Sequence, residues 1–255
     1  MGPRMEKRVE LDADPEQVWE AIATGPGISA WFVPTSVEPS EGGAVVQSFG
    51  GGMDVTGTVL AHEPGRRFAY GAAEPPAEGA NYAFEFLVEG RDGGGTVLRF
   101  VQSGFLDEGW EDEYRAFDTG WDLFFGNLAS CLAHFAGRQA TTVVAMAFVA
   151  TGTDAARRVL DRALGLAGPP AVGERVTLTA EGLDPVTGTV DVATTEFLGV
   201  RTADALYRFG AEGGDAGCGV SAYHYLFGAD RDDAAEKSLT AAWQAWLDGL
   251  FPAAS

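Results

Sequence analysis

Basic residues are scarce in this chain of 255 residues: 17 lysines and arginines stand against 37 acidic residues, and the formal net charge is −20. Such an acidic protein repels the phosphates of nucleic acids and of anionic membranes, so neither is expected as a partner. Long hydrophobic runs are lacking too. The best one, residues 143–150, has the length of a strand, not the ~20 residues of a membrane-spanning helix. Residues 1–14 lack the apolar core of a secretory signal, so a cytoplasmic location is predicted.

Cysteine and histidine are also few. Cys131 and Cys218 are the only cysteines, and both are expected to be free thiols in a reducing compartment. None of the three histidines, His62, His134 and His224, lies in a metal-binding spacing such as H-E-x-x-H. The chain has neither a G-x-S-x-G nucleophile motif nor a phosphate-binding glycine loop. The sequence therefore predicts no cofactor and no metal.

Two pairs of residues could carry chemistry at helical spacing. Cys131 and His134 lie three residues apart, but Cys131 falls on an apolar stripe and no orienting Asn or Asp accompanies it. Asp118 and Asp122 could hold a metal ion, although an exposed acidic helix face is the favoured interpretation. Catalysis is expected at neither pair.

A repeat runs through the chain. The pentapeptide Val-Thr-Gly-Thr-Val at residues 55–59 recurs 131 residues later, and the pattern that begins at Trp121 recurs 122 residues later at Trp243. These matches keep the same order, which indicates duplication of one domain, at residues 1–138 and 139–255. The shrinking offset predicts that the second copy lacks a short helix expected at residues 28–33, because deletions are best tolerated in connections.

Each copy is predicted to contain a strand, a short helix, several hairpin strands and a long C-terminal helix, which is an α+β arrangement. The linker at residues 137–140 is short, so an intramolecular pseudo-dimer is expected. Gly120 and Gly126 interrupt the first long helix, and close packing is expected at both. Spacings of four and three place one apolar stripe along this helix, formed by Trp110, Tyr114, Phe117, Trp121, Phe124, Leu128, Cys131 and Phe135.

Four motifs in residues 6–136 resemble the START-like (SRPBCC) superfamily, in particular domains of the Hsp90-ATPase-activator-homologue (AHSA1-like) type. They are the strand and helix of residues 9–21, the pair Trp31-Phe32, residues 57–68, and residues 102–105 followed by Gly120-Trp121. The resemblance implies a helix-grip fold, in which an antiparallel sheet curls around a long C-terminal helix and encloses an apolar cavity. The second copy lacks the Trp-Phe pair and would be a degenerate member.

Aromatic residues are concentrated in the first copy, which holds 18 of the 28. Large rings line apolar ligand pockets, so a cavity is predicted in residues 1–138 rather than in the second copy. Residues 28–33 would form its lid, and Trp121 its floor. The candidate ligand-binding residues are Trp31, Phe32, Phe68, Tyr70, Tyr82, Phe84, Phe86, Phe100, Trp121 and Phe125, with the hydroxyls of Tyr70 and Tyr82 available to orient a polar group.

Three functions fit this sequence. The first is non-catalytic binding of a small hydrophobic molecule in the N-terminal copy. The second is an enzyme of the cyclase or hydratase kind, acting on an apolar or aromatic substrate, with the pocket tyrosines and His62 as acid or base. The third, implied by the resemblance alone, is a protein-interaction module like the co-chaperone domain, with a chaperone as its partner.

Overall fold

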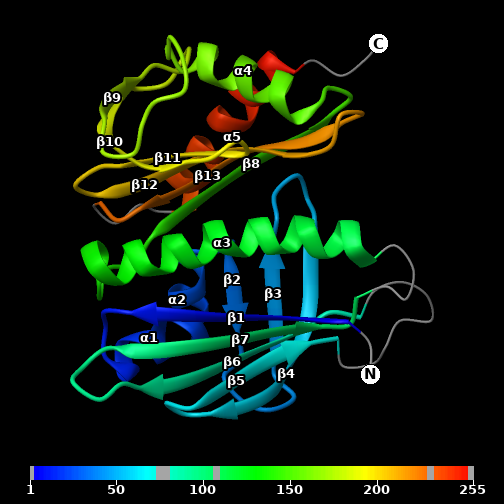
Figure 1. The fold of residues 1–255 in the computed structure, drawn as a ribbon, viewed down its shortest axis with the longest axis vertical. Helices are drawn as coiled ribbons and strands as arrows, with labels where there is room; N and C mark the ends of the chain where they lie inside the picture. The colour runs from blue at the N-terminus through cyan, green and yellow to red at the C-terminus, as the bar shows by residue number, and fades with distance from the viewer. Residues whose placement is uncertain (1–2, 73–80, 106–109, 229–232, 252–255) are drawn as a thin grey trace. The chain divides into compact units, whose positions relative to one another are not determined.

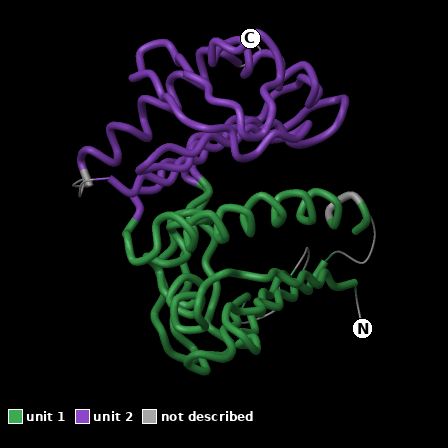
Figure 2. Tube along the Cα trace, turned by 60° about the vertical axis from the view of Figure 1, so that its left-hand side comes forward, with its two compact units in different colours: residues 1–49, 53–139 green, residues 50–52, 140–255 purple. Residues whose placement is uncertain are grey.

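A computed structural model describes residues 3–72, 81–105, 110–228 and 233–251. The chain divides into two compact units (Figure 2). Unit 1 contains residues 1–49 and 53–139, and unit 2 contains residues 50–52 and 140–255. No helix in the described parts of the chain is long and apolar enough to cross a membrane.

Unit 1 is built on one seven-stranded antiparallel sheet with the order β1-β7-β6-β5-β4-β3-β2 (Figure 1). The long helix α3 lies across one face of this sheet, as the helix-grip prediction required. The elements are β1 (Arg4–Leu11), α1 (Pro15–Ala23), α2 (Gly25–Ser29), β2 (Thr35–Val37), β3 (Ala44–Ser48), β4 (Asp54–Glu63), β5 (Arg67–Gly71), β6 (Ala83–Gly90), β7 (Thr96–Ser103) and α3 (Trp110–Phe135).

The short helix α2 begins earlier than the sequence suggested. It was expected at residues 28–33, but it spans Gly25–Ser29. The reason is local: the Thr24 hydroxyl accepts a hydrogen bond from the Gly27 amide at 3.0 Å, which caps the new helix. A Cβ at Gly27 would lie 2.0 Å from the Glu20 carbonyl oxygen, so this glycine lets α2 start directly against α1.

Helix α3 carries the predicted stripe, of which Trp121, Leu128, Cys131 and Phe135 are buried. The expectation of close packing at Gly126 is wrong. This residue is exposed, and a Cβ added there would meet no atom within 4 Å. Gly126 lies on the helix face opposite to the stripe, so its lack of a side chain serves no contact that the structure describes.

Unit 2 repeats this topology without β2. Its six-stranded antiparallel sheet has the order β8-β13-β12-β11-β10-β9, which matches β1-β7-β6-β5-β4-β3 of unit 1 position by position. No helix follows α4 before β9, a stretch in which every residue is described. The elements are β8 (Thr141–Val149), α4 (Thr153–Ala163), β9 (Arg175–Leu178), β10 (Val186–Ala193), β11 (Phe197–Arg201), β12 (Ala205–Gly213), β13 (Cys218–Leu226) and α5 (Asp233–Leu250). The predicted α+β fold and its tandem duplication are confirmed.

One glycine of unit 1 is required by a close approach of two backbones. Gly104 has a φ of +85°, and a Cβ there would lie 1.6 Å from the Asn81 carbonyl oxygen. The Gly104 carbonyl in turn accepts a hydrogen bond from the Asn81 amide at 2.8 Å. This contact joins the segment before β6 to the segment after β7.

We expect Gly104→Ala to lower the free energy of unfolding of unit 1 by ~3 kcal/mol or more, since it combines an unfavourable positive φ with a backbone clash. Gly93→Ala is the matched control. Its φ is +88°, but a Cβ there has open space around it. It should cost only ~1–2 kcal/mol. Urea unfolding of both variants checks the difference, and equal losses would contradict the role assigned to the Asn81 contact.

Candidate ligand-binding site

The inner face of the unit 1 sheet, which faces α3, is lined by aromatic rings. Alternation along β5, β6 and β7 points Phe68, Phe86 and Phe100 to the same side, and all three are fully buried. They are also neighbours in strand register, because Phe86 lies opposite both Phe68 and Phe100. Phe100 contacts Trp121 of α3 with ring centroids 4.3 Å apart. The sheet and the helix are thus joined through rings.

The structure brings every predicted binding residue into one network of ring contacts. Most of the set is buried, and only Tyr82 and Phe84 are partly exposed. The network continues beyond the predicted residues, because the Tyr82 ring contacts the Phe117 ring with centroids 5.0 Å apart. Phe117 and the partly exposed Tyr114 belong to the N-terminal half of α3. The rings therefore form a path from the partly exposed N-terminal half of the helix to a buried interior.

The expected lid is anchored to the core. Trp31 is 1% exposed, and its indole N–H donates to the Ala21 carbonyl at 2.8 Å. Phe32 packs edge-on against Phe124 at 4.6 Å and stacks on Trp121 at 5.2 Å. These rings therefore close the interior between α2 and α3 as part of the core.

Buried polar side chains are set among the rings, and the sequence reading missed them. Gln47 donates to the Tyr70 hydroxyl at 3.1 Å, and the Trp121 indole N–H donates to Gln102 Oε1 at 2.6 Å. The Nε2 of Gln102 has no hydrogen-bond partner among the residues that the structure describes, although Gln102 is 0% exposed. Strand alternation could have revealed Gln102, since Leu98, Phe100 and Gln102 share one face of β7.

Burial acts on two of the titratable groups near this interior, Tyr70 and Cys131. Burial raises the pKa of the Tyr70 hydroxyl above its ordinary value. The hydrogen bond from Gln47 acts in the opposite direction and is the smaller effect. Burial also raises the pKa of the Cys131 thiol to about 12, which opposes formation of the thiolate that a nucleophilic pair with the exposed His134 would need. His62 packs against Trp19, with ring centroids 5.3 Å apart.

The acidic pair on α3 holds a lysine. Lys7 of β1 contacts Asp118 at 2.8 Å and Asp122 at 2.5 Å. Burial lowers the pKa of Lys7, but the hydrogen bonds and charges of the two aspartates outweigh it and raise the pKa above its ordinary value. The pair therefore ties α3 to β1, and the described residues contain no cluster of three or more metal-ligating side chains.

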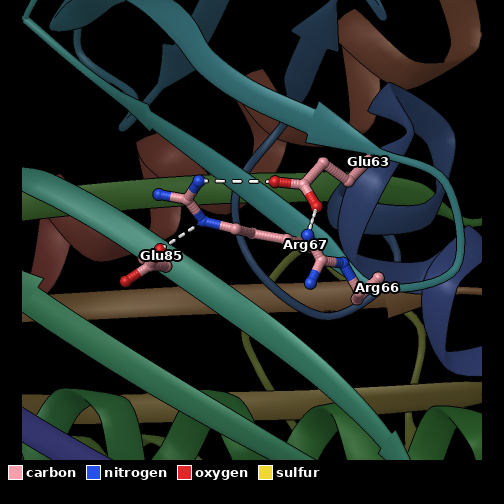
Figure 3. Close-up of polar contacts among 4 residues, drawn as sticks. All are labelled: Glu63, Arg66, Arg67 and Glu85. Atoms are coloured by element: carbon pink, nitrogen blue, oxygen red, sulfur yellow. Dashed lines mark hydrogen bonds and ion pairs between the residues drawn. The ribbon is translucent and has the colours of Figure 1, made fainter.

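The opposite face of the sheet carries charges instead of rings. Arg67 of β5 lies between Glu63 of β4 and Glu85 of β6, at 3.4 Å and 2.5 Å, and Arg66 pairs with the same Glu63 (Figure 3). These side chains are about one-third exposed or more, so each pair is worth only ~0.2–1 kcal/mol. They link three neighbouring strands on the outer face, whereas the inner face carries the aromatic rings.

Residues 12–133 match the family described as Activator of Hsp90 ATPase homolog 1-like protein (AHSA1). These residues of unit 1 form an AHSA1-like domain. The match confirms the resemblance that the motifs had indicated for this part of the chain. A comparison with curated proteins finds no match.

Solved structures are similar to the AHSA1-like unit and to the whole chain. Protein MLL2253 from Mesorhizobium loti is 26% identical, over 52% of this chain and 98% of that one, with a TM-score of 0.47. DynU16, from the dynemicin biosynthetic locus, is 20% identical over 97% of both chains, with a TM-score of 0.44. The di-domain ARO/CYC BexL from the BE-7585A biosynthetic pathway is 12% identical over 99% of this chain and 100% of that one, with a TM-score of 0.47. The fold assignment rests on the strand orders above.

The AHSA1-like unit also has a hollow of about 430 Å³ outside the ring network. It lies between α1, α2 and the C-terminal end of α3, and its lining includes Glu16, Glu20, Cys131 and Phe135. No residue of the predicted binding set lines it.

Unit 2 has a histidine where the AHSA1-like unit has Gln102. His224 follows Gln102 by 122 residues, the same offset that separates Trp243 from Trp121. Its ring lies 4.3 Å from the Trp243 ring, and Phe209 and Tyr207 pack on it at 5.0 Å and 4.9 Å. Burial lowers the pKa of His224 to about 3, and the charge of Arg208 acts in the same direction while a backbone hydrogen bond opposes both.

Because His224 stays neutral in the folded state, it makes unit 2 sensitive to acid. Below its ordinary pKa of 6.5 the unfolded chain takes up a proton that the folded chain does not. As the pH falls from 6.5 towards 3, this histidine should remove up to ~1.4 kcal/mol of stability per pH unit. Glu212 acts in the opposite direction between pH 4.5 and 7, since burial and Glu196 raise its pKa to about 7.

Variants separate the effect of His224 on acid stability from that of Glu212. We expect His224→Phe to lose the acid-dependent destabilisation, and His134→Phe, at an exposed position, to keep it. Opening free energies from amide hydrogen exchange in β12 and β13, measured at about pH 7, 6 and 5, report on unit 2 alone. If wild type and His224→Phe lose protection in parallel, the buried histidine does not set the acid sensitivity.

Proposed function

We propose that the chain binds a small hydrophobic ligand, without converting it, between the inner sheet face and α3 of the AHSA1-like unit. Residues 1–138 would be the binding domain, and residues 139–255 a degenerate second START-like domain that lacks the short second helix. The observation that carries this proposal is the continuous ring network from the partly exposed Tyr82 and Phe84 to the buried Phe100 and Trp121.

The chemistry of the lining supports binding rather than catalysis. A general acid or base works best with a pKa near the operating pH. Tyr70, which lines the network, is held neutral by burial. Cys131, which lies beyond the network, is held as a thiol. Rings provide apolar contact area and well-defined shape, and a few polar groups provide orientation, as in many small-molecule sites.

Unit 2 has a smaller aromatic set in the same place. Trp243, Trp246, Phe209 and His224 pack on one another with centroids 4.3–6.2 Å apart. This smaller set offers a ligand less ring surface than the ten residues of unit 1. We therefore assign ligand binding to unit 1 and a structural role to the Trp243 cluster.

Paired tryptophan variants test this assignment. The neutral fluorescent probe N-phenyl-1-naphthylamine should bind the wild type, and Trp121→Ala should abolish that binding by removing the central ring of the site. Trp243→Ala should keep probe binding and lower the free energy of unfolding of unit 2 by ~3–5 kcal/mol. Near-UV circular dichroism must first show that each variant is folded, because a loosened core also binds such probes.

The opposite pattern, with binding kept in Trp121→Ala and lost in Trp243→Ala, would place the site in unit 2. Mass spectrometry of the purified protein provides a second measurement. A retained apolar metabolite supports binding, whereas its chemical conversion on incubation would favour the cyclase or hydratase alternative.

A further inference from the structure

The Gln102 amide is oriented by its one neighbour. The Trp121 indole nitrogen can only donate a hydrogen bond, so the Gln102 atom that it faces at 2.6 Å must be the oxygen. The amide NH₂ group is therefore left as a donor. It is completely buried and has no partner in the described part of the chain. A buried donor without an acceptor is costly, and native structures seldom keep one without a function.

The strand neighbours of Gln102 offer apolar surface. In strand register it lies opposite Phe84 on one side and Met5 on the other. Phe84 is partly exposed and contacts the Trp121 ring at 5.8 Å. A ring bound on Phe84 would therefore lie beside the free amide.

Charge restricts the kind of acceptor. The lysine on the inner side of β1, Lys7, is already bound by two aspartates of α3. Tyr70, in the same cross-strand row as Gln102 and Phe84, is neutral, and its hydroxyl already accepts from Gln47. An ionised carboxylate at Gln102 would face no free cation among these neighbours, whereas a neutral carbonyl oxygen needs only the amide donor.

Resting on the binding function proposed above, we infer that the ligand of unit 1 is an aromatic or conjugated molecule with a neutral carbonyl group. The Gln102 Nε2–H donates to that carbonyl oxygen, and Trp121 positions the amide. Gln102 is thus the residue that selects carbonyl-bearing ligands over plain hydrocarbons.

Two probes of nearly equal shape test this inference. 2-Acetylnaphthalene carries a carbonyl oxygen, and 2-isopropenylnaphthalene carries a methylene group in its place. Gln102→Met keeps the length of the side chain and removes both the donor and the amide. We expect it to weaken binding of the ketone by about tenfold relative to the hydrocarbon, the range of one buried hydrogen bond. His224→Met, at the equivalent position of unit 2, is the matched control and should leave this ratio unchanged.

Infrared spectra of ¹³C-carbonyl-labelled 2-acetylnaphthalene give a readout that does not depend on affinity. In the wild-type complex the carbonyl stretch should lie below its position in hexane, and in the Gln102→Met complex it should return towards that position. An unshifted band in the wild type would overturn the inference even if the variant does not fold.

The outcomes separate the two proposals. If neither probe binds the wild type, the binding function itself is wrong. If both bind and Gln102→Met changes their affinities equally, or changes neither, then binding stands and the role of Gln102 is wrong. A bound water molecule that merely satisfies the amide would give this last result.

Discussion

The contact between the aromatic inner face of the sheet and the stripe of α3 is the constraint on which unit 1 depends. Trp121 is at its centre, with ring contacts to Phe32, Phe100 and Phe125 and a hydrogen bond to Gln102. Burying these rings is a large favourable term in folding. The same contact places α2 over the interior, because Phe32 and Trp31 complete their burial against α3.

The aromatic interior also explains why the polar groups matter. In an apolar environment a neutral amide is tolerated only with partners, and charged groups only as pairs. Lys7 meets this requirement through Asp118 and Asp122, and Gln47 through Tyr70. Gln102 meets it at its oxygen only. Of these three polar groups, Gln102 lies where the ring network would accept a ligand, so its incomplete hydrogen bonding bears on the specificity proposed for this site.

Duplication gave the two units the same frame and different interiors. Both keep the strand order and a tryptophan in the closing helix, over Gln102 in unit 1 and over His224 in unit 2. Unit 2 has lost α2 and β2 together, and with them the Trp-Phe pair that covers the interior of unit 1. The buried histidine gives unit 2 a dependence on acid that a glutamine cannot have, because only the imidazole titrates near neutral pH.

Sequence patterns alone determined much of this protein. The sheet of hairpins and the 26-residue helix α3 follow from periods of two and 3.6, and the duplication follows from the recurring Val-Thr-Gly-Thr-Val segment. The candidate rings could be named because aromatic residues are concentrated in the first copy. Other features needed the structure. The start of α2 depended on a hydroxyl cap at Thr24, and the exposure of Gly126 depended on the helix face that it occupies. The anchoring of Trp31 depended on a carbonyl ten residues away. The pairing of Gln102 with Trp121 joins β7 to α3. Only the tertiary structure decides such a pair, because a hydrogen bond depends on the distance and direction of two atoms, and a one-dimensional pattern records neither.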